Sequence, residues 1–460
     1  MLTYDLDKRG NKTMYEYLYE LIKEDIADGK LKADEKLPSK RGLSQHLQIS
    51  VKTVENAYEQ LLLEGYIRSE EKRGYYVNKI AVVTGGAPGY AAPVKRFQEE
   101  TYLADLTANN IRYDRFPFAT WAKVMRETLT DYNTSLLKTV PFNGVLQLRE
   151  AIADHLNRYR GMQVSADHII IGAGTEYLYN RLLQLLGPDV KFGVENPGYR
   201  KITKIYDENG VDWDYVNIDD KGMKVDELRM KDINVAHVSP EHHFPIGLVM
   251  PVARRQELLN WAAEEPGRYI IEDDYDSEFR YRGKPIPSLQ SSDDRGKVIY
   301  IGTFSKAIAP AIRVSYMVLP ETLLEVYRRD CSFYSCTVSR IDQRILNEFI
   351  RDGYFERHLN KMRMRYRAKH DQLLEGLEPF QKKFRISGED AGLHLLLTAK
   401  GNVTEKELLD AAAAENVKVY GMSENMVASA ADKATVLLGF GSMDEADMKE
   451  GLRRLQNAWL

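Results

Sequence analysis

The stretch Tyr-Ile-Gly-Thr-Phe-Ser-Lys at residues 300–306 begins in a short apolar run, 298–301, and continues into hydroxyl side chains and a lysine. Such a run is typical of a buried strand in a parallel sheet. Amphipathic helical stretches separate it from four similar runs, at residues 168–171, 192–194, 235–238 and 269–271. This alternation predicts an α/β fold in which helices cover both faces of a mostly parallel sheet.

Residues that suit a ligand follow these runs. In open α/β sheets, ligands lie beyond the carboxyl ends of the strands. Residues 172–176 lead into a helix and can direct free N–H groups at a phosphate, and Tyr199 follows a tight Pro-Gly turn. Residues 272–275 read Glu-Asp-Asp-Tyr, and Lys306 and Arg313 follow the last run. Together these groups are what pyridoxal 5'-phosphate (PLP) requires.

Three motifs carry a resemblance to a known family: Ile-Glu-Asp-Asp-Tyr-Asp-Ser-Glu-Phe-Arg-Tyr at residues 271–281, the stretch at 300–306, and Phe-Ile-Arg-Asp-Gly-Tyr at 349–354. By these motifs residues 104–460 resemble a fold-type I aminotransferase. The whole chain resembles the MocR/GabR subfamily of GntR regulators. The resemblance implies a PLP-binding effector domain at 104–460, with a smaller C-terminal α/β subdomain from about residue 349.

The resemblance also assigns roles to individual residues. Lys306 is expected to be the lysine that bonds covalently to PLP, and Asp273 the partner of the pyridine nitrogen. Tyr275 is expected to hold the ring oxygen, and Tyr199 to stack on the ring. The phosphate is assigned to the turn and to nearby side chains, namely Gly174, Thr175, Glu176, Thr303, Ser305 and Arg313.

Two departures from aminotransferases bear on activity. Phe244 stands where an asparagine commonly precedes the proline, and it cannot hydrogen-bond the ring oxygen. No arginine lies between Arg385 and Arg453, so Lys433 is the remaining possible effector contact in the expected neighbourhood. A lysine is a point charge rather than a two-pronged fork. We therefore expect weak recognition of an amino-acid carboxylate, and slow or absent transamination.

The first 79 residues predict a winged helix-turn-helix. Helical patterns at 14–26, 39–47 and 50–62 precede two short β-prone runs within 66–77. Leu-Pro-Ser-Lys-Arg and Ser-Val-Lys-Thr-Val, which begin at Leu37 and Ser50, resemble the GntR family. The third helix is expected to enter the major groove of DNA. The expected DNA contacts are Lys40, Arg41, Lys52 and Thr53 on the helices and Arg73, Gly74 and Tyr75 on the wing. A minority of such modules bind proteins instead.

The composition constrains the function further. The net charge is −4, yet residues 36–54 hold four basic and no acidic side chains, a local basic face. Two cysteines are too few for a disulfide framework or a four-thiolate site, and no metal is expected. No apolar run is long enough to cross a bilayer, and the start lacks an export pattern, so a cytoplasmic protein is expected. Residues 80–103 are expected to link the DNA-binding domain, 1–79, to the effector domain.

Three functions remain open on the sequence. The leading one is a ligand-responsive transcription regulator that binds operator DNA, senses PLP or a PLP-reactive amine or amino acid, and forms a head-to-tail homodimer. The rival is an active aminotransferase with an attached DNA-binding module. The third is a DNA-binding or scaffolding protein with a vestigial pocket.

Overall fold

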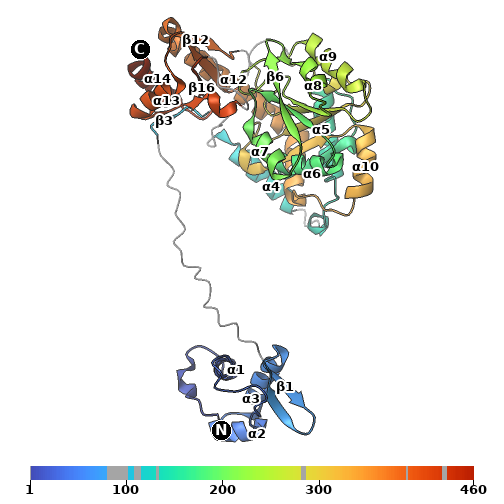
Figure 1. Ribbon diagram of the computed structural model, residues 1–460, viewed down its shortest axis with the longest axis vertical. Coiled ribbons are helices and arrows are strands. Elements are labelled where there is room, and N and C mark those ends of the chain that lie inside the picture. Colours follow the sequence, from blue (N-terminus) through green and yellow to red (C-terminus); the bar gives the residue numbers. More distant parts are fainter. Residues whose placement is uncertain are drawn as a thin grey trace. The chain divides into compact units, whose positions relative to one another are not determined.

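The computed structural model describes residues 2–79, 102–107, 115–130, 134–280, 286–389, 392–426 and 433–460. It divides into two compact units, Met1–Glu99 and Glu100–Leu460 (Figure 1). The expected linker at 80–103 lies outside the described residues, except for its last two positions.

The first unit is the winged helix-turn-helix that the sequence predicts. Its elements are α1 (Met14–Ala27), α2 (Lys40–Leu47), α3 (Val51–Leu63) and the antiparallel hairpin of β1 (Ile67–Glu70) and β2 (Gly74–Val77). Val54, Ala57 and Leu61 recur at helical spacing on α3 and are fully buried. Ser50 caps α3, because its Oγ accepts a hydrogen bond of 3.0 Å from the backbone N–H of Thr53.

An eight-stranded sheet forms the centre of the second unit, with strand order β4-β11-β10-β9-β8-β5-β6-β7. The strands from β10 through β6 in this order pair in parallel, whereas β11 and β7 pair antiparallel with their neighbours. All five predicted strands belong to it. Their bounds and those of the rest are β4 (Ile169–Gly172), β5 (Phe192–Asn196), β6 (Trp213–Asp219), β7 (Gly222–Met223), β8 (Val235–Val238), β9 (Tyr269–Asp274), β10 (Val298–Thr303) and β11 (Ser315–Val318).

Helices cover both faces of this sheet (Figure 1). On β4, Ile169 and Ile171 pack into one core with α5 and α11, while Ile170 packs into another with α6. Neighbouring residues of a strand point to opposite faces, so a strand that is apolar throughout needs cover on both. The helices are α4 (Phe118–Thr130), α5 (Leu146–Tyr159), α6 (Thr175–Leu186), α7 (Arg200–Glu208), α8 (Val225–Met230), α9 (Val252–Ala263), α10 (Glu321–Cys331) and α11 (Arg340–Arg351).

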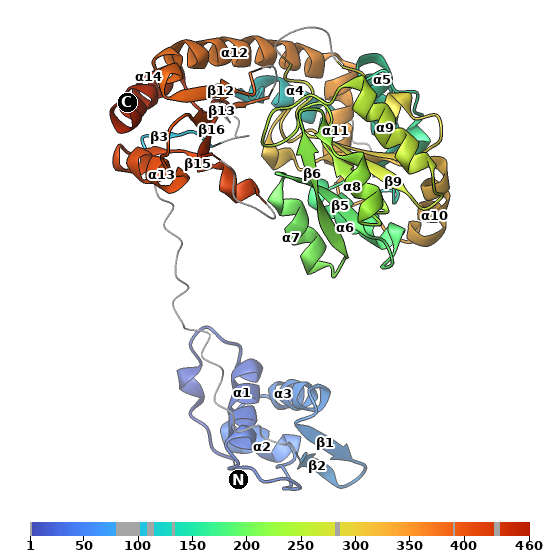
Figure 2. The same cartoon turned by 45° about the horizontal axis from the view of Figure 1, so that its top comes forward.

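A smaller subdomain holds the C-terminal part of the chain. Its four-stranded antiparallel sheet has the order β12-β13-β16-β15, and α12, α13 and α14 pack around it (Figure 2). Residues 102–107 also belong here, because β3 pairs with β14 and Ala104 is buried in this core. The bounds are β3 (Ala104–Asp105), α12 (Tyr354–Gly376), β12 (Phe384–Ser387), β13 (His394–Ala399), α13 (Glu405–Ala414), β14 (Val417–Lys418), β15 (Tyr420–Gly421), β16 (Thr435–Gly439) and α14 (Glu445–Trp459).

Within the part of the chain that the structure describes, no helix is long and apolar enough to span a membrane.

Replacing Ser50 with Ala should destabilise the first unit by about 1 kcal/mol, because α3 loses its N-cap. Urea titration of the fragment 1–79 measures this free energy of unfolding. Ser69→Ala, an exposed position on β1, is the control and should change it by less than about 0.5 kcal/mol. Equal effects of the two substitutions would contradict the role of the cap.

Candidate functional site

A cavity of about 360 Å³ opens beyond the carboxyl ends of β9 and β10. It gathers nearly all the residues that the sequence analysis assigned to PLP, and it adds several that the analysis missed. The lining consists of Thr175, Glu176, Tyr179, Tyr199, Lys201, Ser239, Phe244, Asp273, Tyr275, Thr303, Ser305, Lys306 and Arg313. Gly174 lies directly beside it, against Arg313.

Lys306 follows β10, and its side chain is largely buried in the cavity wall. This burial lowers the pKa of Lys306 to about 8, because an ammonium group loses hydration there. A lysine with a lowered pKa carries more of the neutral amine at neutral pH, and the neutral amine is the form that attacks a carbonyl carbon. The setting therefore suits covalent attachment of an aldehyde.

The alternation of side chains along β9 selects one carboxylate of the acidic triplet. Asp273 faces the cavity, and its Oδ2 lies 3.7 Å from Nε2 of His237. On the opposite face, Glu272 is fully buried and accepts hydrogen bonds from the backbone N–H groups of residues 289 and 290. Asp274 is held there by Arg160 at 2.9 Å. Only Asp273 of the triplet is thus placed to meet a ligand.

His237 was missed by the sequence analysis. It lies on β8 beside Asp273 and positions that carboxylate. Its Nδ1 lies 2.9 Å from the hydroxyl of Tyr206, and both side chains are buried. This contact fixes the ring so that Nε2 faces the carboxylate of Asp273. The signal in the sequence was a polar residue inside the apolar run of β8.

Three of the four aromatic side chains that line the cavity form one part of its wall. Tyr199 directly precedes α7 and contacts Phe244 edge to face, with ring centroids 5.8 Å apart. The hydroxyl of Tyr275 donates a hydrogen bond of 2.8 Å to the backbone oxygen of His242. Phe244 lines the cavity where the sequence analysis noted a missing amide. At this part of the wall the aromatic rings can pack against a ligand, but Phe244 cannot form a hydrogen bond with it.

The turn before α6 and the segment after β10 form a polar end of the cavity. Gly174 has φ +90°, and a Cβ at this position would lie 2.2 Å from a guanidinium nitrogen of Arg313. Glycine is therefore required for Arg313 to lie against the turn. The hydroxyl groups of Ser305 and Ser315 both hydrogen-bond to Oγ1 of Thr303. Guanidinium, hydroxyl groups and a helix N-terminus together are a donor set that fits a phosphate.

Glu176 adds an acidic group to this polar end. Its Oε2 accepts a hydrogen bond of 2.6 Å from Arg313, and its Oε1 contacts Nζ of Lys201. Burial alone would raise the pKa of Glu176, but the bonds from Lys201 and Arg313 outweigh burial and lower the pKa to about 2. The carboxylate is therefore ionised throughout the neutral range. Lys201, the second residue of α7, was not anticipated from the sequence.

A buried network of charges lies beneath the site. Arg160 contacts Asp274 at 2.9 Å and Glu241 at 3.0 Å, and Arg255 contacts Glu241 at 3.2 Å. Arg160 lies 81 residues before Glu241 and 114 before Asp274 in the chain, so no local pattern could reveal this network. They fix the end of β9, from which Asp273 projects.

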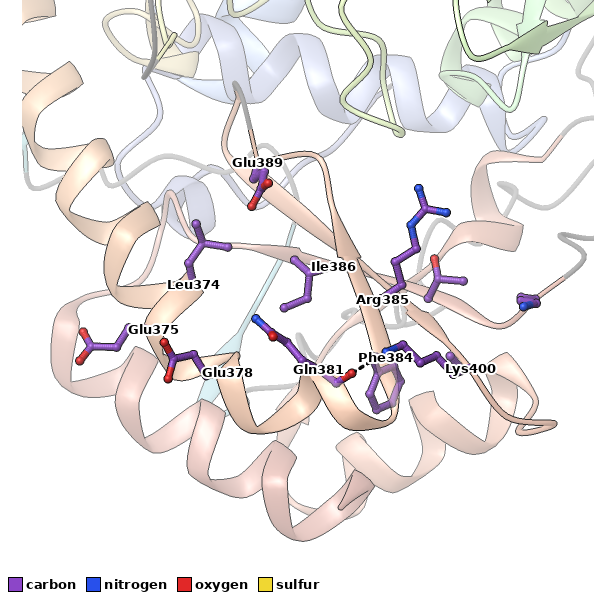
Figure 3. A pocket seen from close by; sticks show the side chains of 12 residues that line it. Leu374, Glu375, Glu378, Gln381, Phe384, Arg385, Ile386, Glu389 and Lys400 are labelled. Carbon is purple, nitrogen blue, oxygen red and sulfur yellow. Dashed lines mark hydrogen bonds between the residues drawn. The ribbon is translucent and has the colours of Figure 1, made fainter.

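Lys433 is not brought to this cavity. It lines a separate groove of about 770 Å³ in the small subdomain, together with residues that include Arg385, Glu389 and Lys400 (Figure 3). It precedes β16, whereas the far end of that strand, Gly439, pairs with His394. His394 in turn contacts Phe244 of the cavity wall. The length of β16 thus separates Lys433 from the site at which a carboxylate contact was expected.

The expected DNA-binding residues lie on α2, the start of α3 and the wing. Lys40 and Lys52 both form ion pairs with Glu55, at 2.9 and 3.0 Å. Nζ of Lys40 also lies 5.5 Å from the ring centroid of Tyr75, and Arg41 is exposed. Thr53 contacts Ser50 at the cap of α3. Arg73, which precedes Gly74 on the wing, contacts Glu70. The basic face is therefore partly neutralised by Glu55, which follows the acid-free stretch.

Among the described residues, no group of three or more His, Cys, Asp or Glu side chains is arranged to hold a metal ion. Cys331 and Cys336 are both buried free thiols.

Comparison with known proteins shows the family. Residues 102–455 match the model of aminotransferase class I and II, and residues 14–77 match that of the bacterial regulatory proteins of the gntR family. The chain is 38% identical to the uncharacterized HTH-type transcriptional regulator YdeL of Bacillus subtilis, over 97% of this chain and 96% of that protein. It is 29% identical to the probable rhizopine catabolism regulatory protein MocR of Rhizobium meliloti, over 99% and 95%.

The chain belongs to the MocR-type regulators. In these proteins a GntR helix-turn-helix precedes an aminotransferase-like domain, which agrees with both units of the fold. The crystal structure of the multiple substrate aminotransferase from Thermococcus profundus aligns with a TM-score of 0.69 and 26% identity, over 78% of this chain and 92% of that one. Homologues with this fold are PLP-dependent, and a GntR module implies DNA binding.

The lowered pKa of Lys306 predicts its reactivity. Acetic anhydride labels only neutral amines, so labelling of Lys306 in the protein without added PLP should rise with pH and reach half its maximum at about pH 8. Labelling of an ordinary lysine reaches half its maximum at about pH 10.4. Mass spectrometry of the peptide that contains Lys306 measures the profile. A midpoint above about pH 10 would show that burial does not perturb this amine.

Proposed function

We propose that this MocR-type chain acts in the cytoplasm as a ligand-responsive transcription regulator that binds operator DNA through its first unit and PLP through its second. The observation that carries the proposal is the cavity in which Lys306, Asp273 and Tyr275 meet a phosphate-type donor set. The same chain carries a winged helix-turn-helix, so occupancy of the cavity would control how tightly the chain binds DNA. The signal would be PLP itself or an amine or amino acid that reacts with it.

Each residue would act on PLP through its position. Lys306 would bond to the aldehyde carbon, and Asp273, oriented by His237, would hold the proton of the pyridine nitrogen. Tyr275 would face the ring oxygen and Tyr199 the ring plane. The phosphate would lie at the polar end, on the N-terminus of α6, Thr303, Ser305 and Arg313. When bound, PLP supplies an electron sink that labilises bonds to an attached amine.

Two observations favour regulation over efficient transamination. Among the described residues that line the cavity, the basic side chains are Lys201, Lys306 and Arg313, and two of them contact Glu176. Within the described lining, Arg313 is therefore the one arginine, and it is already engaged by Glu176 rather than free for a substrate carboxylate. Phe244 provides no hydrogen bond to the ring. A misplacement of about 1 Å can cost on the order of a hundredfold in rate.

The complete set of lysine, aspartate and tyrosine keeps an active aminotransferase as the second candidate. The two candidates differ in turnover. Steady transamination on the order of 10 per second with a standard amino acid and keto acid would favour the enzyme. A single slow exchange, without multiple turnover, would favour the regulator.

We also propose a head-to-tail homodimer through the aminotransferase-like domain.

Lys306→Ala should abolish covalent attachment of PLP while leaving the fold intact. The wild-type chain should show a visible absorbance band with PLP, and borohydride should fix the cofactor to the peptide that contains Lys306. Lys204→Ala, an exposed lysine on α7, is the matched control and should behave like the wild type. A band that persists in Lys306→Ala would show that another amine holds PLP. A wild-type chain without any band would overturn the proposal that the cavity binds PLP.

Lys52→Ala combined with Arg41→Ala should weaken binding to any DNA duplex and reduce the slope of log affinity against log salt by roughly 1 for each lost phosphate contact. Glu55→Gln should have the opposite effect, because it releases Lys40 and Lys52 to contact phosphates. Fluorescence anisotropy over a range of salt concentrations measures both. Lys8→Ala, which changes an exposed lysine, is the control. Unchanged slopes in all variants would place the DNA-binding surface elsewhere.

A further inference from the structure

The polar end of the cavity already contains an anion of the chain itself. Glu176 is the second residue of α6, lines the cavity, and lies within hydrogen-bond reach of both Lys201 and Arg313. Lys201 comes from α7, and Arg313 follows β10 by ten residues. The carboxylate therefore joins cations from two separate segments at the place where a phosphate would be held.

A phosphate at this end would need the same donors. Gly174 allows the guanidinium of Arg313 to lie against the turn before α6, and one of its terminal nitrogens is bonded to Glu176 at 2.6 Å. The exposed fraction of the side chain is 51% for Arg313 and 49% for Lys201, so both cations remain open to a ligand. The first turn of α6 also favours negative charge, and Glu176 already occupies it.

We propose that Glu176 is a built-in competitor of the cofactor's phosphate group, which weakens the binding of phosphorylated ligands in this cavity. The inference rests on the proposed function, since it takes PLP as the ligand. In the sequence analysis Glu176 belonged to the turn that holds the phosphate. Its backbone N–H retains that role, whereas its side chain opposes it.

The competition makes the site reversible. A phosphate ester carries a charge of about −1.5 to −2 and would repel the ionised carboxylate unless Glu176 gives up its contacts with Lys201 and Arg313. Every such exchange replaces an existing charge-assisted hydrogen bond instead of making a new one. Affinity for PLP is thereby lowered, and occupancy follows the concentration of free PLP, as a sensor requires. An enzyme that holds its cofactor permanently has no use for this arrangement.

The test compares Glu176→Gln with the wild type in the full-length chain. Gln keeps the shape of the side chain and removes its charge. Titration with PLP, followed by the visible absorbance band, gives the dissociation constant, and the same titration with pyridoxal gives the value for a ligand without phosphate. Glu325→Gln, an exposed glutamate on α10 outside the cavity, is the matched control for the change in net charge. Melting curves establish that each variant is folded.

We expect Glu176→Gln to bind PLP roughly tenfold more tightly, with the affinity for pyridoxal unchanged within about twofold. Inorganic phosphate should also compete with PLP at lower concentration in this variant. Unchanged or weaker binding of PLP would overturn the inference, and weaker binding would show that Glu176 instead positions Arg313 for the phosphate. Equal tightening for PLP and pyridoxal would also overturn it. These outcomes all presuppose a wild-type band, whose absence contradicts the proposed function itself.

Discussion

The site depends on the convergence of parallel strands at one edge of the large sheet. The strands from β10 to β6 run in one direction, so the residues that follow them meet beyond the same edge. Successive side chains of β9 point to opposite faces of the sheet, and this alternation decides which of its acidic residues enters the cavity. Asp273 enters, while Glu272 and Asp274 are turned into the protein. Both inward carboxyl groups have partners there, Arg160 for Asp274 and two backbone N–H groups for Glu272, because a carboxylate without a partner is costly to bury.

Much of this could be predicted from the sequence. The five apolar runs became five strands of one sheet, and the three helices and hairpin of the first unit lie within two residues of the predicted bounds. The residues after each run meet in one cavity because topology alone brings them together. What the sequence could not show are contacts between distant segments. Lys201 and His237 act through such contacts, and the distance of Lys433 from the cavity follows from the register of β16.

Two surfaces of this chain share one electrostatic design. In the first unit Glu55 contacts both Lys40 and Lys52, and in the second Glu176 contacts both Lys201 and Arg313. In each case cations that would meet a phosphate group are held by a carboxylate of the chain. Such an arrangement lowers affinity but leaves the cations in place, which suits a protein that must release its ligands. An unopposed cluster of the same cations would bind phosphate groups more tightly and less selectively.

The central claim is that occupancy of the cavity controls the binding of DNA. The most direct test measures the affinity of the full-length chain for a duplex selected from a random pool, with and without saturating PLP and then with candidate amines. The account predicts that one of these ligands changes the affinity by at least about fivefold, and that Lys306→Ala removes the change. The same affinity for DNA in the presence and absence of every ligand, in a chain that demonstrably binds PLP at Lys306, would contradict it.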